Sequence, residues 1–185
     1  LVEHFQVKRY CRLGAMYDAV PHTRPLLVTG SLGSVQQNRP VPHFKARGST
    51  YQGPTTIMNL LSEGLERSEV ETISLMVHLP QYVQLEEDYA GTSRMIEVLS
   101  SVYDTIPQDL APMRRGQRQY RELTVSVERN SELKDLVQQM EAYYDAQLDS
   151  EESGADEPEP TAKLSPNIEK FLSELGESFG SNDEE

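Results

Sequence analysis

The sequence predicts an α/β fold with a mainly parallel sheet, flanking helices and a C-terminal helical hairpin. Short apolar runs bounded by proline and glycine indicate buried strands. Between these runs lie segments with apolar residues at helical spacing, and such alternation is typical of layered α/β domains. From Pro112 onward only helical patterns occur, which predicts the hairpin.

Three segments are expected to be strands: residues 8–17, Pro25–Gly30 and Val70–Pro80. The third is a nearly unbroken apolar run, as expected of a strand covered on both faces. Residues 31–53 are rich in Gly, Ser, Gln, Asn and Pro and are predicted to form a long loop.

Two helices are expected inside the α/β part. Gly53-Pro54 opens the first, because a proline at the first helical position loses no needed hydrogen bond. Asp88 is placed to cap the second. The predicted apolar face of the first helix consists of Ile57, Leu60, Leu61 and Leu65. The predicted buried side of the second consists of Met95, Ile96, Leu99 and Val102.

The hairpin is expected to break at Asn130-Ser131, with Ser131 capping its second helix. The packing stripe of that helix should be Leu133, Leu136, Val137, Met140 and Tyr144. The resulting organisation is an α/β core over 1–111, a helical hairpin over 112–148, an acidic linker over 149–163, and a short helix with an acidic tail over 164–185.

The formal charge of −13 is unevenly distributed over the 185 residues. From Asp149 to the end there are twelve acidic and two basic residues, so residues 1–148 carry only −3. The one basic patch, Arg114 to Arg121, is expected to be a solvated helix face or a dock for this acidic tail. We therefore expect no nucleic-acid partner, since phosphate binding needs a clustered positive face.

The last segment recovers a helical pattern after Ser165-Pro166. An isolated helix of this length is marginal in water, so it should dock on the body, a neighbouring subunit or a partner. The expected partner-docking residues are Ile168, Phe171, Leu172 and Leu175.

Composition also bears on the compartment. The single cysteine, Cys11, cannot form an internal disulfide, which favours a reducing cytoplasm. No apolar run is long enough to span a membrane, so no membrane partner is expected. The abrupt start at Leu1 suggests that the natural protein has residues before it.

Several segments together carry a resemblance to a known family. Residues 13–30 read "LGAMYDAVPHTRPLLVTG" and contain a Pro-His-Thr-Arg-Pro step after a strand. Residues 44–104 contain a Gly-Pro helix start and a strand that ends in "VHLP" before a glutamate-rich loop. This order resembles the proteasome assembly chaperone type 2 family, in its actinobacterial branch, over about residues 8–148.

The resemblance implies an α/β fold similar to that of nucleoside phosphorylases, and homo-oligomeric assembly, for instance as a trimer. It also implies a further N-terminal part of the sheet, and proteasome-related proteins as candidate partners. Family chaperones dock on proteasome rings through a C-terminal hydrophobic-Tyr-any residue ending. This chain ends in "NDEE", so that ending is absent from it.

Two loops supply the candidate ligand site. "VPHTRP" lies between two predicted strands and "HLPQYV" follows a third, and ligands bind beyond the carboxyl ends of parallel strands. If the loops share one edge of the sheet, His22, Thr23, Arg24, Tyr82, Glu86, Glu87 and Asp88 converge. Arg24 would grip a carboxylate or phosphate, and His22 would transfer protons.

The structural interpretation of the same residues is favoured. Arg24 then pairs with an acid, such as Asp18 or one of residues 86–88, and His22 bonds a backbone carbonyl. His78 is a hydrogen-bonded core histidine, and Gly30 and Gly33 allow a turn. No metal cluster, cofactor fingerprint or nucleophile elbow is visible, so we expect no metal and no cofactor.

These observations favour a self-associating protein without catalytic activity that acts through protein–protein interaction. An enzyme or small-ligand-binding protein with a phosphorylase-like pocket is the alternative. A regulatory nucleic-acid binder ranks third.

Overall fold

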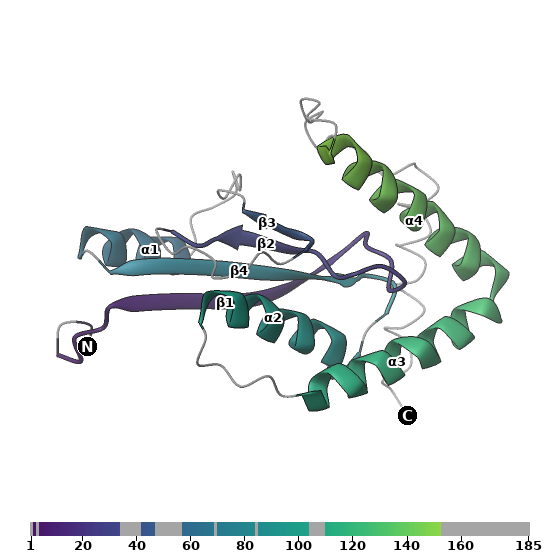
Figure 1. Cartoon of the computed structure of the whole chain (residues 1–185), viewed down its shortest axis with the longest axis horizontal. Helices are drawn as coiled ribbons and strands as arrows, with labels where there is room; N and C mark the ends of the chain where they lie inside the picture. Colours follow the sequence, from purple (N-terminus) through teal and green to yellow (C-terminus); the bar gives the residue numbers. More distant parts are fainter. Residues whose placement is uncertain are drawn as a thin grey trace.

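The computed structural model describes residues 2, 4–33, 42–46, 57–68, 70–83, 85–103 and 110–152. Its strands are β1 (Arg9–Asp18), β2 (Val28–Ser31), β3 (Phe44–Ala46) and β4 (Glu71–Pro80). Its helices are α1 (Ile57–Arg67), α2 (Tyr89–Val102), α3 (Leu110–Glu128) and α4 (Ser131–Glu152) (Figure 1). The predicted helix start at Gly53-Pro54 lies outside the described residues.

The strands form one mixed sheet in the order β1-β4-β2-β3. The β1–β4 and β2–β3 pairs are parallel, and only the β2–β4 pair is antiparallel. The predicted α/β class with a mainly parallel sheet is therefore confirmed. The long loop predicted over residues 31–53 was wrong in one respect, because β3 lies inside it. Three residues are too few to show a periodic pattern, and only the pairing with β2 identifies them as a strand.

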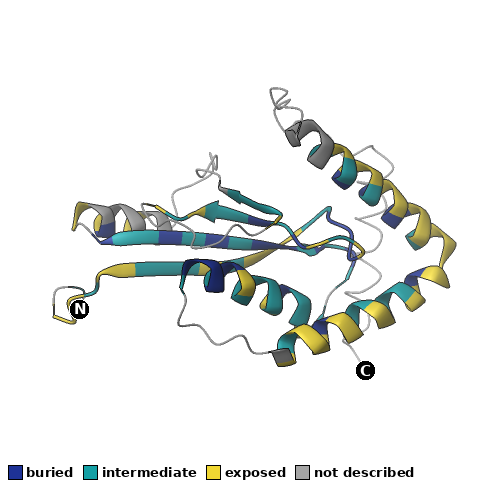
Figure 2. Cartoon of the chain, viewed as in Figure 1, coloured by how far each residue is buried: buried dark blue, intermediate teal, exposed yellow. Residues whose placement is uncertain are grey.

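One face of the sheet holds the main core, beneath α2. Its buried side chains come from β2, β4 and α2 and are Val28, Ile73, Leu75, Val77, Val98 and Val102, joined by Leu26. Because side chains alternate along a strand, the other face of β4 presents Thr72, Ser74 and Met76, which are only half-buried. The predicted cover on both faces of β4 is therefore uneven: the face toward α2 is largely buried and the other face is half-buried apart from His78 and Pro80, and Figure 2 shows buried and intermediate positions along the strand.

Helix α1 does not bury the apolar face that its spacing predicted. Leu65 is buried, but Ile57, Leu60 and Leu61 are 79%, 58% and 43% exposed. Within the described part of the chain, no element covers them. Periodicity finds the apolar side of a helix, but it does not say whether the same chain provides the surface that covers it.

The predicted buried side of α2 is confirmed in part. Val102 is buried in the core together with Val98, which was not predicted. Met95 and Leu99 pack against the core, although these two and Ile96 are only half-buried. These three line an apolar groove of about 490 Å³ with residues of β1 and β4, among them Leu13, Ala15, Val77 and Leu79. Because α2 packs mainly over β4 and β2, it leaves this side of β1 uncovered.

The C-terminal hairpin is present, and its helices meet at an open angle (Figure 1). The break at Asn130 is as predicted, but the cap is Asn130 itself: its Oδ1 accepts from the N–H groups of Glu132 and Leu133 at 3.0 and 3.2 Å. The predicted stripe is confirmed, since Leu136, Val137, Met140 and Tyr144 are buried and Leu133 packs against the cluster. The helix continues to Glu152, past the predicted start of the linker.

Two further expectations from the sequence concern membrane-spanning helices and the partner-docking segment. Among the described residues, none of the helices combines the length and apolar character needed to span a bilayer. The predicted partner-docking residues, Ile168, Phe171, Leu172 and Leu175, lie outside the described residues.

Candidate functional site

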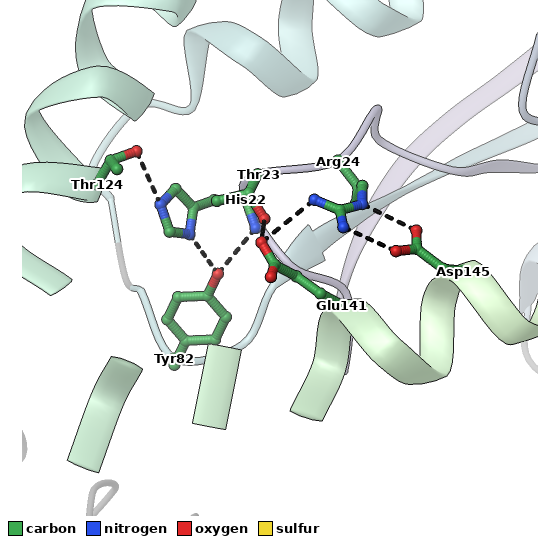
Figure 3. A network of polar contacts seen from close by, with 7 residues as sticks. All are labelled: His22, Thr23, Arg24, Tyr82, Thr124, Glu141 and Asp145. Carbon is green, nitrogen blue, oxygen red and sulfur yellow. Dashed lines mark hydrogen bonds and ion pairs between the residues drawn. The ribbon is translucent and has the colours of Figure 1, made fainter. Parts of the chain in front are cut away.

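A network of polar side chains joins the β1–β2 loop to the helical hairpin. Figure 3 shows it, and we call it the loop network: His22, Thr23, Arg24, Tyr82, Thr124, Glu141 and Asp145. The first three lie in the loop between β1 and β2, and Tyr82 follows β4. Thr124 comes from α3, and Glu141 and Asp145 come from α4.

His22 is the buried centre of the loop network. The Tyr82 hydroxyl accepts from the His22 backbone N–H at 2.8 Å and lies 2.6 Å from His22 Nδ1. Thr124 Oγ1 donates its proton to the Tyr120 carbonyl at 2.9 Å, so it accepts from His22 Nε2, 3.2 Å away, and the proton of the ring is on Nε2. In the neutral ring Nδ1 is then an acceptor and receives the Tyr82 hydroxyl proton. Each polar atom in this series of hydrogen bonds, from the Tyr82 hydroxyl to the Tyr120 carbonyl, therefore has a partner.

Burial sets the protonation states here. Desolvation lowers the pKa of His22, and the nearby Glu141 carboxylate only partly opposes it. Desolvation likewise raises the pKa of Tyr82 well above its ordinary value. Both groups are therefore neutral at physiological pH. A neutral histidine with both nitrogens engaged holds the loop in place and has no free nitrogen for proton transfer to a ligand.

Arg24 is the second anchor of the loop. Its Nε and Nη2 form a fork on the Asp145 carboxylate at 2.8 and 2.7 Å, and Nη1 lies 3.2 Å from Glu141 Oε1. Thr23 Oγ1 donates to the same Glu141 oxygen. The hydrogen bond to Asp145 raises the pKa of Arg24, and the same bond lowers the pKa of Asp145. These bonds use three of the five guanidinium donors of Arg24, so its fork of Nε and Nη2 is taken up as an internal clamp on α4.

The three acidic residues of the predicted site lie elsewhere. Glu86 and Glu87 are exposed, and the Glu87 carbonyl accepts from Gln119 Nε2 at 2.7 Å. Asp88 caps α2, as predicted, with Oδ1 2.7 Å from the Gly91 N–H. Its Oδ2 accepts from the Tyr120 hydroxyl at 2.8 Å. The structure therefore brings together His22, Thr23, Arg24 and Tyr82 but not the acidic run.

A groove of about 550 Å³ opens beside Arg24, between the segment that precedes β2 and the helices α2 and α3. It is lined by Arg24, Pro25, Leu26, Pro42, His43, Ala90, Ser93, Arg94, Glu97, Met113, Gly116, Gln117 and Tyr120. Arg94 is engaged like Arg24: its Nε donates to the Leu26 carbonyl at 2.8 Å, Nη1 to Glu97 at 2.5 Å, and Nη2 to the Pro42 carbonyl. Both arginines of the groove thus serve the fold.

Sequence reasoning identified the kind of contact at Arg24 but named the wrong partners. It proposed Asp18 or an acid in 86–88, and the partners are Glu141 and Asp145. A signal was present, because two acids four residues apart share one face of a helix. It also missed the Tyr82 and Thr124 partners of His22, since a backbone carbonyl was expected.

His78 is buried and both its ring nitrogens have partners, as expected of a hydrogen-bonded core histidine. Gly33, with φ of 59°, lies in a turn as predicted, whereas Gly30, with φ of 154°, lies within β2 and not in a turn. Within the described ranges, no three His, Cys, Asp or Glu side chains gather closely enough to bind a metal ion.

Comparison with known proteins shows which family and which solved structures this chain is similar to. The sequence model of the PAC2 family matches residues 1–124. No curated protein gives a significant match. A crystal structure of a protein of unknown function from Corynebacterium glutamicum is 26% identical with a TM-score of 0.70, covering 80% of this chain and 54% of that one.

Two further solved structures share the fold. A PAC2 family protein from Streptomyces avermitilis is 24% identical, with a TM-score of 0.56 over 74% of this chain and 56% of its own. A proteasome-assembly chaperone homologue from Mycobacterium tuberculosis is 22% identical, with a TM-score of 0.57 and the same two coverages. This chain thus spans about half the length of the solved structures that it matches.

Proposed function

We propose, on the premise that this chain belongs to the PAC2 family, that it associates with itself and works through protein–protein contacts. The observation that carries this proposal is the open apolar surface around β1. A role alongside multi-subunit complexes would agree with the description of one structural neighbour as a proteasome-assembly chaperone homologue.

Strand β1 lies at the edge of the sheet and pairs only with β4 among the described strands. Its second half, Leu13 to Tyr17, carries no charge. Leu13, Met16 and Tyr17 are 48%, 44% and 51% exposed, and Figure 2 shows that much of β1 is exposed or only half-buried. Edge strands normally carry charges or prolines that discourage pairing, and this stretch has neither. It therefore offers its free backbone groups and apolar side chains to another chain.

The apolar groove beside β1 extends this surface. Met95, Ile96 and Leu99 of α2 form one wall, and Leu13 and Ala15 of β1 form another. The groove and the exposed Leu13 make one apolar area on the α2 side of the sheet, and Met16 adds an exposed apolar side chain on the opposite face of the same edge strand. Contiguous exposed apolar surface of this kind marks interaction sites, whereas single exposed apolar residues do not.

The occupant that we propose is a second copy of this chain. Two β1 strands related by a twofold axis can pair antiparallel, which extends both sheets and satisfies both open edges. The absence of charge from Leu13 to Tyr17 suits such pairing, because residues of this stretch then face one another across the two strands without charge repulsion. The charged half of β1 is already engaged, since Arg9 pairs with Glu71 at 2.5 Å.

The alternative, a small-ligand site at the loop network, is less well supported. Arg24 and His22 would have to bind the ligand, yet both ring nitrogens of His22 and three of the five N–H donors of Arg24 serve other side chains of the loop network. A ligand that binds Arg24 in a fork through Nε and Nη2 would need to displace Asp145 first. The geometry therefore supports protein–protein contact ahead of small-molecule binding.

Light scattering after size exclusion tests self-association. We expect the chain to elute as an oligomer at micromolar concentration and Leu13→Arg to shift it to the monomer. The control is Val125→Arg, because Val125 is similarly exposed, at 45%, but lies on α3. A wild-type chain that stays monomeric over about a hundredfold concentration range would refute the proposal.

Capture of other proteins tests the predicted partner-docking segment, residues 164–185. We expect a defined complex to be retained by the whole chain and lost when that segment is removed. Recovery that does not depend on the segment would contradict its predicted role, while leaving self-association through β1 to the light-scattering test.

A further inference from the structure

Three side chains from three adjacent strands form a second polar network, separate from the loop network. His78 Nδ1 lies 2.6 Å from Asp18 Oδ2, and His78 Nε2 lies 2.8 Å from Thr29 Oγ1. Asp18 ends β1, His78 lies near the end of β4, and Thr29 lies near the start of β2. Carboxylate, imidazole and hydroxyl therefore stand in a line across the sheet.

The two contacts fix the direction of each hydrogen bond. An ionised carboxylate only accepts, so the proton of the ring is on Nδ1 and points at Asp18. Nε2 is then an acceptor and receives the Thr29 hydroxyl proton, which leaves the oxygen lone pairs of Thr29 available. This is the arrangement of nucleophile, base and orienting carboxylate that activates a hydroxyl for acyl transfer.

Asp18 is held ionised in this position. Burial alone would raise its pKa, but hydrogen bonds from His78 and from the Ala19 N–H, the latter 2.7 Å from Oδ1, outweigh that effect and lower the pKa. The Asp18 backbone carbonyl also accepts from the Gln81 N–H at 3.1 Å, which fixes the end of β1 to the turn after β4. The carboxylate is thus preorganised to stabilise an imidazolium at His78.

The position within the fold suits a reactive site. β1 and β4 are parallel, so Asp18 and His78 lie at the carboxyl end of the pair, where α/β proteins bind ligands. Thr29 is half-buried, and Met16, the register partner of His78 on β1, is 44% exposed. Neither of the two grooves described above includes Thr29, so an acyl donor would have to reach it from this partly exposed face of the sheet.

The same strand end holds a spare donor. Gln81 Nε2 is buried and has no hydrogen-bond partner among the described residues. A buried donor without a partner costs about 1–3 kcal/mol, so its persistence calls for an explanation.

We propose that Thr29 is an acyl-accepting nucleophile, with His78 as its general base and Asp18 as the positioning residue, acting on a small carboxylic ester. Thr29 Oγ1 bonds to the ester carbonyl carbon while its proton moves to His78 Nε2. The tetrahedral adduct collapses, its ester C–O bond breaks, and the departing alcohol takes the proton from His78. Water then attacks acyl-Thr29 with His78 again as base, which releases the carboxylic acid and returns the proton to Thr29.

The test uses the whole chain with 4-nitrophenyl acetate, followed by peptide mass mapping of the acetyl group. We expect acetyl-Thr29 in the wild type and in Thr29→Ser, and none at this position in Thr29→Val, which keeps the shape but lacks the hydroxyl. His78→Gln should slow acetylation of Thr29 about 100-fold or more, which is the scale of general-base catalysis. Asp18→Asn should slow it as well.

Thr72→Val is the matched control. Thr72 is a half-buried strand threonine like Thr29, but it lies on β4 and is not part of the network of Asp18, His78 and Thr29. It should leave acetylation of Thr29 unchanged. Each variant is checked for folding by circular dichroism. If His78→Gln does not fold, Asp18→Asn provides the comparison, and the wild type alone can refute the proposal. Acetyl groups confined to lysines or other histidines, or acetyl-Thr29 forming equally fast without His78 or Asp18, would show a purely structural hydrogen-bond network.

Discussion

Replacing Tyr82 by phenylalanine tests whether the loop network holds the hairpin on the sheet. The change removes one oxygen and leaves the ring, which packs with Val127, Leu136 and Met140. That oxygen contacts two atoms of His22: the backbone N–H at 2.8 Å and Nδ1 at 2.6 Å. Tyr82 and His22 are 7% and 5% exposed, so water cannot replace the lost oxygen without rearrangement.

The expected loss of stability follows from the two atoms of His22, the backbone N–H and Nδ1, that lose their hydrogen-bond partner. A buried donor or acceptor left without a partner costs about 1–3 kcal/mol, and the two groups here belong to one residue whose loop can adjust in part. We therefore expect Tyr82→Phe to lower the free energy of unfolding by about 2–3 kcal/mol. For a chain of this size that corresponds to a drop in Tm of about 4–10 °C.

Chemical denaturation at several protein concentrations measures this, because self-association would otherwise add to apparent stability. Tyr143→Phe is the control: Tyr143 lies on α4, is 45% exposed, and should change stability by less than about 0.5 kcal/mol. If Tyr82→Phe fell in the same range as the control, the hydroxyl would not be a structural anchor and our account of the loop network would be wrong.

Two further predictions concern helix packing and pH. Gly116→Ala should destabilise the protein by about 1–3 kcal/mol in thermal melts, because its Cβ would lie 2.6 Å from the Ala90 nitrogen where α3 crosses α2. Gly64→Ala, which meets open space on α1, should instead stabilise by up to about 1 kcal/mol, and equal effects would contradict this packing. Because folding lowers the pKa of His22, the unfolded chain binds its proton more readily, so stability should fall as pH drops below about 6.5. His22→Gln should flatten that part of the stability profile, and an unchanged slope would exclude His22 as its origin.

The sequence predicted well those elements that local patterns encode. The apolar run of β4, the Asp88 cap and the α4 stripe from Leu133 to Tyr144 follow from the side chains of each segment and were found as expected. These features depend on neighbours three or four residues away, or on alternation along a strand, and both are visible in the chain itself.

Other features escaped because their partners are distant in sequence. β3 is a strand only because three residues meet β2, and Asn130 rather than Ser131 caps α4 because its side chain reaches two backbone N–H groups. Arg24 was expected to have an acidic partner, but only the path of α4 back over the loop selects Glu141 and Asp145.

By itself, the sequence determined the α/β class, the kinship and the amphipathic character of each helix, since these depend on composition and short-range spacing. Only the tertiary structure decided which apolar faces are covered, which acid pairs with Arg24, and that Asp18, His78 and Thr29 meet across the sheet. The physical reason is that strand order and register bring together Asp18 and His78, 60 residues apart, and the path of α4 brings together Arg24 and Asp145, 121 residues apart, and no local pattern in the chain specifies either pairing.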